Sequence, residues 1–188
     1  MHYLIKKEGK ESYMAIKLDM SKAYDRVEWC FLKKVMERMG FNEKWISLIM
    51  NCITTVSYSV LINGVAQSCI TPTRGLCQGD PISLYLFLLC SEGFTCLILE
   101  ATRNNRLSGI SICRNCHTVT HLLFADDSII YCKASGQESK EVLRILQKHE
   151  EALGQKINTD KSSVSFSRNT KEEKRKEVKD ILGSMQDT

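Results

Sequence analysis

The chain has 188 residues, of which 43% are hydrophobic and 26% are charged. This is the composition of a globular protein with a buried core, and it excludes a disordered, collagen-like or coiled-coil chain. The net charge of +4 permits a nucleic-acid partner without requiring one.

The first part of the chain predicts a strand, a helix and a hairpin. Residues 13–18 form a short apolar run, typical of a buried strand, that ends at Asp19. Residues 28–39 carry apolar side chains at helical spacing, and Gly40 is placed to end that helix. Farther along, two apolar runs flank Asn63-Gly64, the strongest short signal for a β-hairpin.

A second helix is predicted to begin after Asn42, which is a favoured N-cap residue. Its apolar positions recur at helical spacing and predict one buried face. We assign that face to Trp45, Leu48, Ile49 and Cys52.

One segment is apolar enough to imitate a membrane span. Residues 81–99 come close to the ~20 apolar residues that a bilayer helix needs. Glu92 and Gly93 interrupt the run, Pro81 pre-sets its first turn, and no basic cluster adjoins either end. We therefore interpret the segment as a helix enclosed by the domain and expect no membrane partner.

The second half of the chain predicts further strands, at residues 107–113, 117–124, 129–132 and 164–167. Two capping-box patterns predict the helices among them. The first begins with Ser135 and Glu138 and continues to Leu153, and the second begins with Thr170 and Glu173. Strands and helices interleave without strict βαβ alternation, so the predicted fold class is α+β.

The nine cysteines are an odd number at irregular spacings. No stretch with the basic, apolar and small-residue regions of a secretory signal opens the sequence. We therefore expect reduced thiols and an intracellular location, in the nucleus or cytoplasm, in place of secretion and a disulfide scaffold.

Two adjacent carboxylates, Asp126 and Asp127, stand between strongly apolar runs. Successive side chains of a strand point to opposite faces, so both carboxylates reach one site only if the backbone turns there. Such close negative charges repel one another, and a divalent cation such as Mg²⁺, which prefers oxygen ligands, would compensate them. The alternative is a polar hairpin tip, where aspartate is also common.

Asp19 favours the metal hypothesis because it too ends an apolar strand, and Asp25 follows soon after it. Two such strands would converge on a two-metal site, whose ions lie ~3.5–4 Å apart and stabilise both oxygens of a phosphoryl transfer. We accordingly expect the Asp19 and Asp126 carboxylates to lie within about 8 Å of each other. On these residues alone, a nuclease and a polymerase both remain open.

Four motifs occur in a specific order along the chain. They are residues 19–25 (DMSKAYD), 74–81 (RGLCQGDP), 124–127 (FADD) and 154–161 (GQKINTDK). Together they resemble the palm motifs of reverse transcriptases from non-LTR (LINE-type) retrotransposons, over nearly the whole chain. The resemblance implies an RNA-directed DNA polymerase palm, an antiparallel sheet with helices packed on one face. It implies as partners an RNA template, a DNA primer and deoxynucleoside triphosphates.

The resemblance also implies roles for the acidic residues. Asp19, Asp126 and Asp127 would be catalytic carboxylates that hold two Mg²⁺ ions, with Mn²⁺ as a substitute. The backbone carbonyl of Met20 would complete the shell of one ion. Lys161 matches the late palm lysine that is proposed to protonate the leaving pyrophosphate, although an isolated lysine is ordinarily solvated surface.

Nucleotide and template contacts fall on two of the motifs. By resemblance, Tyr24 would form an aromatic floor under the incoming sugar and exclude its 2′-hydroxyl; a core tyrosine is the alternative. Gln78, Gly79 and Pro81 match the loop that packs near the template and the incoming base. Cys77 departs from the family, which usually carries a basic residue there, so a contact to phosphate or template is lost.

We assign residues 1–168 to the palm and residues 169–188 to a charged C-terminal helix and tail. The family's fingers would precede this chain, and its primer grip and thumb would follow it. Because nucleotide and primer would then be poorly aligned, we expect little or no primer extension from the chain alone. The alternative to a polymerase is a truncated, non-catalytic relic with at most weak nucleic-acid binding.

Cys113, Cys116 and His117 have the spacing of a haem attachment site, and with His121 they could instead form a zinc-binding module. These residues straddle the start of a predicted strand, where alternate side chains point apart. We therefore expect neither haem nor tetrahedral zinc there, and interpret the segment as a loop that contains cysteines.

Overall fold

The computed structural model describes residues 11–187 except 112, 114–115, 125–126 and 184. In chain order the helices and strands are β1 (Tyr13–Ser21), α2 (Trp29–Arg38), α3 (Glu43–Thr54), β2 (Tyr58–Ile62), β3 (Val65–Ile70), α4 (Pro81–Arg103), β4 (Ile110–Ser111), β5 (Thr118–Val119), β6 (His121–Phe124), β7 (Asp127–Lys133), α5 (Gly136–Leu153), β8 (Lys156–Ile157), β9 (Ser163–Phe166), α6 (Glu172–Leu182) and β10 (Gln186–Asp187).

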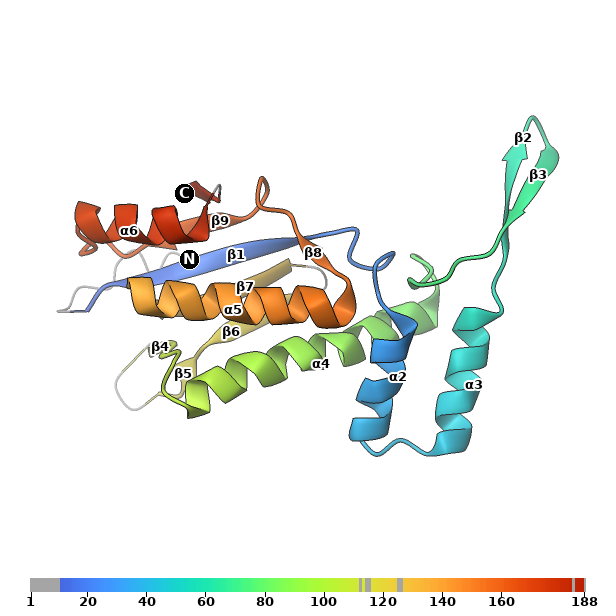
Figure 1. Ribbon diagram of the computed structural model, residues 1–188, viewed down its shortest axis with the longest axis horizontal. Coiled ribbons are helices and arrows are strands. Elements are labelled where there is room, and N and C mark those ends of the chain that lie inside the picture. Colours follow the sequence, from blue (N-terminus) through green and yellow to red (C-terminus); the bar gives the residue numbers. More distant parts are fainter. Residues whose placement is uncertain (1–10, 112, 114–115, 125–126, 184, 188) are drawn as a thin grey trace.

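The main sheet is centred on β1 (Figure 1). Its strand order is β10-β9-β1-β7-β6, and β8 pairs with the end of β1. Strands β7, β8 and β9 all run antiparallel to β1, and the short β10 runs parallel to β9. The predicted α+β class with a mainly antiparallel sheet is confirmed.

Helices α4, α5 and α6 pack on one face of this sheet. Ile16 and Leu18 of β1 and Ile130 of β7 join a core cluster with Phe94 of α4 and Ile145 of α5. These five side chains are at most 2% exposed. The alternate residues of β1 point to the opposite face, which these helices do not cover.

A second cluster joins α2 and α3 to the first half of α4. The β2–β3 hairpin extends from this end of the molecule (Figure 1), and all of its strand residues are exposed. Asn63 and Gly64 have φ angles of 51° and 80°, as the tight turn of such a hairpin requires. The predicted hairpin is therefore confirmed.

Among the described residues, α4 is the one helix that is long and apolar enough to cross a membrane, judged by length and composition alone. The core helix of a globular protein meets the same criteria. Phe87 and Phe94 of α4 are buried in the two clusters, but Tyr85 is 67% exposed and Leu88 46%. The helix is thus covered along one side, whereas the sequence predicts a helix enclosed by the domain.

The buried face of α3 differs from the prediction. The structure buries Ile46, Ile49 and Ile53, whereas Trp45 is 49% exposed and Leu48 53%. Both sets of residues recur at helical spacing, so periodicity cannot separate them. Packing in the cluster with α2 and α4 selects the isoleucine side.

Two predicted N-caps are confirmed. The side-chain oxygens of Asn42 and Ser135 accept backbone N–H groups in the first turns of α3 and α5. The predicted cap at Thr170 is wrong, because α6 has Lys171 at its N-cap. The Thr170 hydroxyl is instead hydrogen-bonded to the hydroxyl of Ser167, at 3.0 Å.

Candidate active site

Asp19 and Asp127 are register partners at the end of the β1–β7 pair. The side chains of such partners lie on the same side of a sheet, with Cβ atoms about 4.5–5.5 Å apart. Because Leu18 packs toward the helices, the two carboxylates are on the face that α4, α5 and α6 leave open. Both residues are half-buried.

Asp126 lies outside the described residues, in the connection between β6 and β7, and so does its predicted approach to Asp19. Within the described part of the chain, no three His, Cys, Asp or Glu side chains form a cluster that could hold a metal. The candidate metal site therefore has two described carboxylates and one that the structure does not describe.

The segment that follows α5 holds the backbone of Asp19 in place. The Asp19 N–H donates to the hydroxyl of Ser162 at 3.2 Å, and the Asp19 carbonyl accepts from the N–H of Asn158 at 2.9 Å. Ser162 is fully buried, and its hydroxyl donates to the Asn158 carbonyl at 2.7 Å. These positioning residues were missed from the sequence, although they lie within or beside the motif at residues 154–161.

Replacing Ser162 with alanine is expected to lower the free energy of unfolding by about 1–2 kcal/mol, because the Asp19 N–H and the Asn158 carbonyl each lose a buried partner. Urea denaturation measures the loss. Ser59→Ala on the exposed hairpin is the control and should leave stability unchanged. Equal stabilities of the two variants would contradict this role of Ser162.

The turn after β1 carries Tyr24, whose ring stacks on Phe87 of α4 with centroids 4.6 Å apart. The Tyr24 carbonyl accepts the N–H of Leu76 at 2.9 Å, and the Trp29 indole donates to the carbonyl of Gly75 at 2.7 Å. A backbone hydrogen bond thus joins the motifs at residues 19–25 and 74–81. Tyr24 is half-buried, so its ring is both packed and partly accessible.

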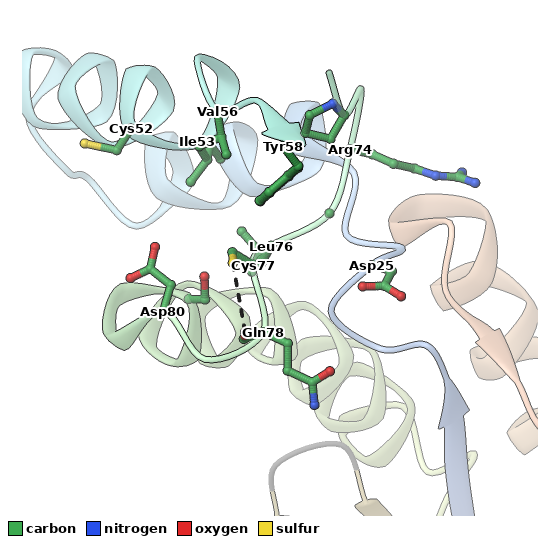
Figure 2. Close-up of a pocket in the computed structure, with 13 residues that line it drawn as sticks. Asp25, Cys52, Ile53, Val56, Tyr58, Arg74, Leu76, Cys77, Gln78 and Asp80 are labelled. Carbon is green, nitrogen blue, oxygen red and sulfur yellow. Dashed lines mark hydrogen bonds between the residues drawn. The ribbon is translucent and has the colours of Figure 1, made fainter. Parts of the chain in front are cut away.

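A pocket of about 350 Å³ lies beside this junction, between α3, the base of the hairpin and the loop that leads into α4. Figure 2 shows Asp25 toward one end of the pocket and Cys52 toward the other, with Gln78 on the loop between them. Arg74, another lining residue, is ion-paired with Glu28 at 3.1 Å. The pocket therefore brings together polar groups from the motifs at residues 19–25 and 74–81.

Cys77 and Tyr58 interact within this pocket. The pKa of the Tyr58 hydroxyl is raised, mainly by a hydrogen bond with Cys77 and to a smaller extent by burial. Asp80 caps α4 by accepting the N–H of Ile82 at 3.1 Å. At the position where the resemblance implies a cation, this chain thus has a cysteine hydrogen-bonded to a phenol.

The other predicted site residues occupy different surroundings. Gln78 and Gly79 are exposed in the loop, and Pro81 is the first residue of α4. The side chain of Met20 is buried in the second cluster, and its backbone pairs with β8. Lys161 is exposed in the turn before β9, and within the described residues no hydrogen bond or ion pair joins it to the carboxylates.

Cys113 and Cys116 form a disulfide, so the expectation of reduced thiols is wrong for this pair; the other seven cysteines are free. The connection between β4 and β5 brings the two Cα atoms to 5.4 Å, within the range that a disulfide spans. Sulfur atoms bonded to each other are not thiolate ligands for zinc. The expected absence of haem and zinc at this loop stays a prediction.

A family model described as reverse transcriptase (RNA-dependent DNA polymerase) matches residues 2–183. The chain belongs to the reverse transcriptase family. The Pol polyprotein of the type-1 retrotransposable element R2 from Popillia japonica is 27% identical over 130 residues, which cover 69% of this chain and 20% of that protein. A 149 kDa protein of transposon TX1 from Xenopus laevis is 28% identical over 153 residues, which cover 79% of this chain and 11% of that protein.

These two relatives show a reverse transcriptase domain of the non-LTR retrotransposon type. A mitochondrial protein of Arabidopsis thaliana is 50% identical over 68 residues, covering 36% of this domain and 56% of that protein. The domain thus matches from 11% to 56% of the length of these three relatives.

Solved telomerases share the fold of this reverse transcriptase domain. Telomerase from Candida tropicalis, in complex with a fragment of telomeric RNA, superposes with a TM-score of 0.61 at 16% identity, covering 89% of the domain and 28% of that chain. The apo enzyme of the same species, truncated from the C-terminal domain, gives a TM-score of 0.59 at 21% identity. The match covers 90% of the domain and 34% of that chain. The predicted palm fold is confirmed by this likeness.

Proposed function

We propose that this domain transfers a deoxynucleotide from its triphosphate to a primer 3′-hydroxyl, copying an RNA template. The hydroxyl would attack the α-phosphate, and pyrophosphate would leave. The observation that carries the proposal is the pairing of Asp19 with Asp127 on the face of the sheet that the helices do not cover. Asp25 and most of the motif at residues 74–81 line a pocket in the same domain.

The described donor atoms fit the divalent ions that the family generally uses. Carboxylate oxygens are the ligands that Mg²⁺ prefers, and the half-buried side chains leave room for an ion that keeps some of its water. Asp19, Asp126 and Asp127 would hold two Mg²⁺, or Mn²⁺, together with the Met20 carbonyl. Bound ions supply charge neutralisation at the attacking and leaving oxygens.

The remaining residues would position the substrates. Tyr24 is proposed as the floor under the sugar, because stacking on Phe87 fixes its ring. Gln78, Gly79 and Pro81 would contact the template and the incoming base at the loop that borders the pocket. Lys161, which is exposed, would donate a proton to pyrophosphate once the substrates are bound. An intracellular location is part of this proposal.

Manganese binding to the purified domain tests the acidic site directly. Electron paramagnetic resonance measures free Mn²⁺, so the affinity of each variant can be compared without catalysis. We expect Asp19→Asn to weaken Mn²⁺ binding by about tenfold or more, because a direct ligand is lost. Asp180→Asn, at an exposed position of α6, removes the same charge and should bind like wild type.

Equal affinities of the Asp19 and Asp180 variants would contradict the proposed metal site. Primer extension at low salt with Mn²⁺ then separates a polymerase from a relic. We expect little extension, all of it abolished by Asp19→Asn. A wild-type signal equal to that of Asp19→Asn would support the relic, which Cys77 in place of a cation also favours.

A further inference from the structure

Lys17 is the one charged residue of β1 before Asp19, within the otherwise uncharged run from Tyr13 to Leu18. It precedes Asp19 by two positions and therefore points to the same face of the sheet. Its ammonium lies 3.4 Å from a carboxylate oxygen of Asp127. The proposed function assigns no role to this cation.

We propose that Lys17 is a positioning residue that holds Asp127 in the absence of a divalent ion and thereby weakens the affinity of the acidic site for that ion. This inference rests on the proposed function, because it requires a cation to bind between Asp19 and Asp127. It concerns the strength of binding at the site and leaves the identity of the ligands unchanged.

The register of the strands creates the competition. Asp127 is paired with Asp19, whereas Lys17 is paired with Ile129, two positions along the sheet. Positions two residues apart on a strand are separated by about 6.6 Å. The Asp127 carboxylate can therefore contact either the Lys17 ammonium on one side or an ion shared with Asp19 on the other. A cation that draws Asp127 toward Asp19 must displace Lys17.

Exposure makes this displacement feasible. The side chains of Lys17 and Asp127 are 42% and 45% exposed, so water can solvate the ammonium once the carboxylate turns away. A fully buried pair would cost too much to break, because each ion would lose its only compensation. Lys17 therefore acts as a replaceable counterion for the carboxylates, whose negative charges otherwise repel one another.

Substitution of Lys17 tests the inference through Mn²⁺ affinity measured by electron paramagnetic resonance. Lys17→Met is expected to bind Mn²⁺ about fivefold more tightly, the equivalent of one half-exposed ion pair. Lys17→Arg keeps the charge and should stay within about twofold of wild type. A purely structural role for Lys17 would instead make Lys17→Met weaken Mn²⁺ binding.

The control is Lys33→Met on α2, where the ammonium is 3.9 Å from Glu37 in a comparably exposed pair. It removes the same net charge at an ion pair that includes neither Asp19 nor Asp127, so it measures the general electrostatic effect. Circular dichroism checks that the variants fold. If Lys17→Met unfolds the domain, Lys17→Gln, which keeps a polar end, repeats the comparison.

Equal Mn²⁺ affinities of the Lys17 and Lys33 variants would overturn the inference. If Asp19→Asn still weakens binding in that experiment, the proposed metal site survives and only the role of Lys17 fails. A wild-type domain that binds no Mn²⁺ above the level of Asp19→Asn would overturn both proposals together.

Discussion

Replacing Gly75 with alanine is expected to lower the free energy of unfolding by about 3 kcal/mol. Gly75 has a φ angle of +91°, which L-residues with a side chain rarely adopt. A Cβ atom at this position would also lie 2.7 Å from the carbonyl oxygen of Asp25. Because that neighbour is backbone, it cannot rotate away as a side chain would.

Hydrogen bonds on both sides of Gly75 prevent the loop from moving to relieve the contact. The Gly75 N–H donates to the Val27 carbonyl at 2.8 Å, and the Gly75 carbonyl accepts from the Trp29 indole at 2.7 Å. Relief of the clash would break at least one of these bonds. The same shift would disturb the turn that carries Tyr24, whose carbonyl is bonded to Leu76.

Gly40→Ala is the matched control, because Gly40 has a φ angle of +81° and a Cβ there would meet nothing within 4 Å. Its expected cost is about 1 kcal/mol, from the backbone conformation alone. Urea denaturation of both variants isolates the contribution of the close approach at Gly75. Equal losses would show that the contact with Asp25 is relaxed at little cost.

Acidification is expected to destabilise the domain through His149, by about 2 kcal/mol between about pH 7.5 and about pH 5. His149 is 2% exposed and contacts the ring of Phe94. Its Nδ1 atom is buried and has no hydrogen-bond partner among the described residues. Burial without compensation lowers the pKa of His149 to about 4.

The sign of this effect follows from the two protonation equilibria. An unfolded histidine has a pKa of about 6.5, so as the pH falls the unfolded chain binds the proton before the folded domain does. The stability contributed by His149 is therefore complete above about pH 6.5 and is lost as the pH falls toward the folded pKa of about 4.

The measurement is the difference in unfolding free energy between about pH 7.5 and about pH 5. His149→Leu should reduce that difference by about 2 kcal/mol, whatever its effect on stability at neutral pH. His117→Gln, at an exposed position, should leave the difference unchanged. A pH dependence that survives in His149→Leu would assign the acid sensitivity to other groups.

Local signals in the sequence were sufficient for much of this fold. The apolar run before Asp19, the turn at Asn63-Gly64 and the caps at Asn42 and Ser135 all predict what the structure contains. Each depends on residues that are close in the chain, so a short window of sequence holds the physical cause. The order of four motifs similarly indicated the family without any coordinates.

Contacts between distant segments decided the rest. Trp45 and Ile46 are adjacent and both apolar, yet only packing against other helices determines that Ile46 is the buried one. The pairing of Lys17 with Asp127 follows from strand register, and the close approach of Gly75 to Asp25 follows from two loops meeting. The sequence by itself determined the fold family and which residues are candidates for the chemistry. Tertiary structure alone decided which of them face one another, because register and packing join segments far apart in the chain.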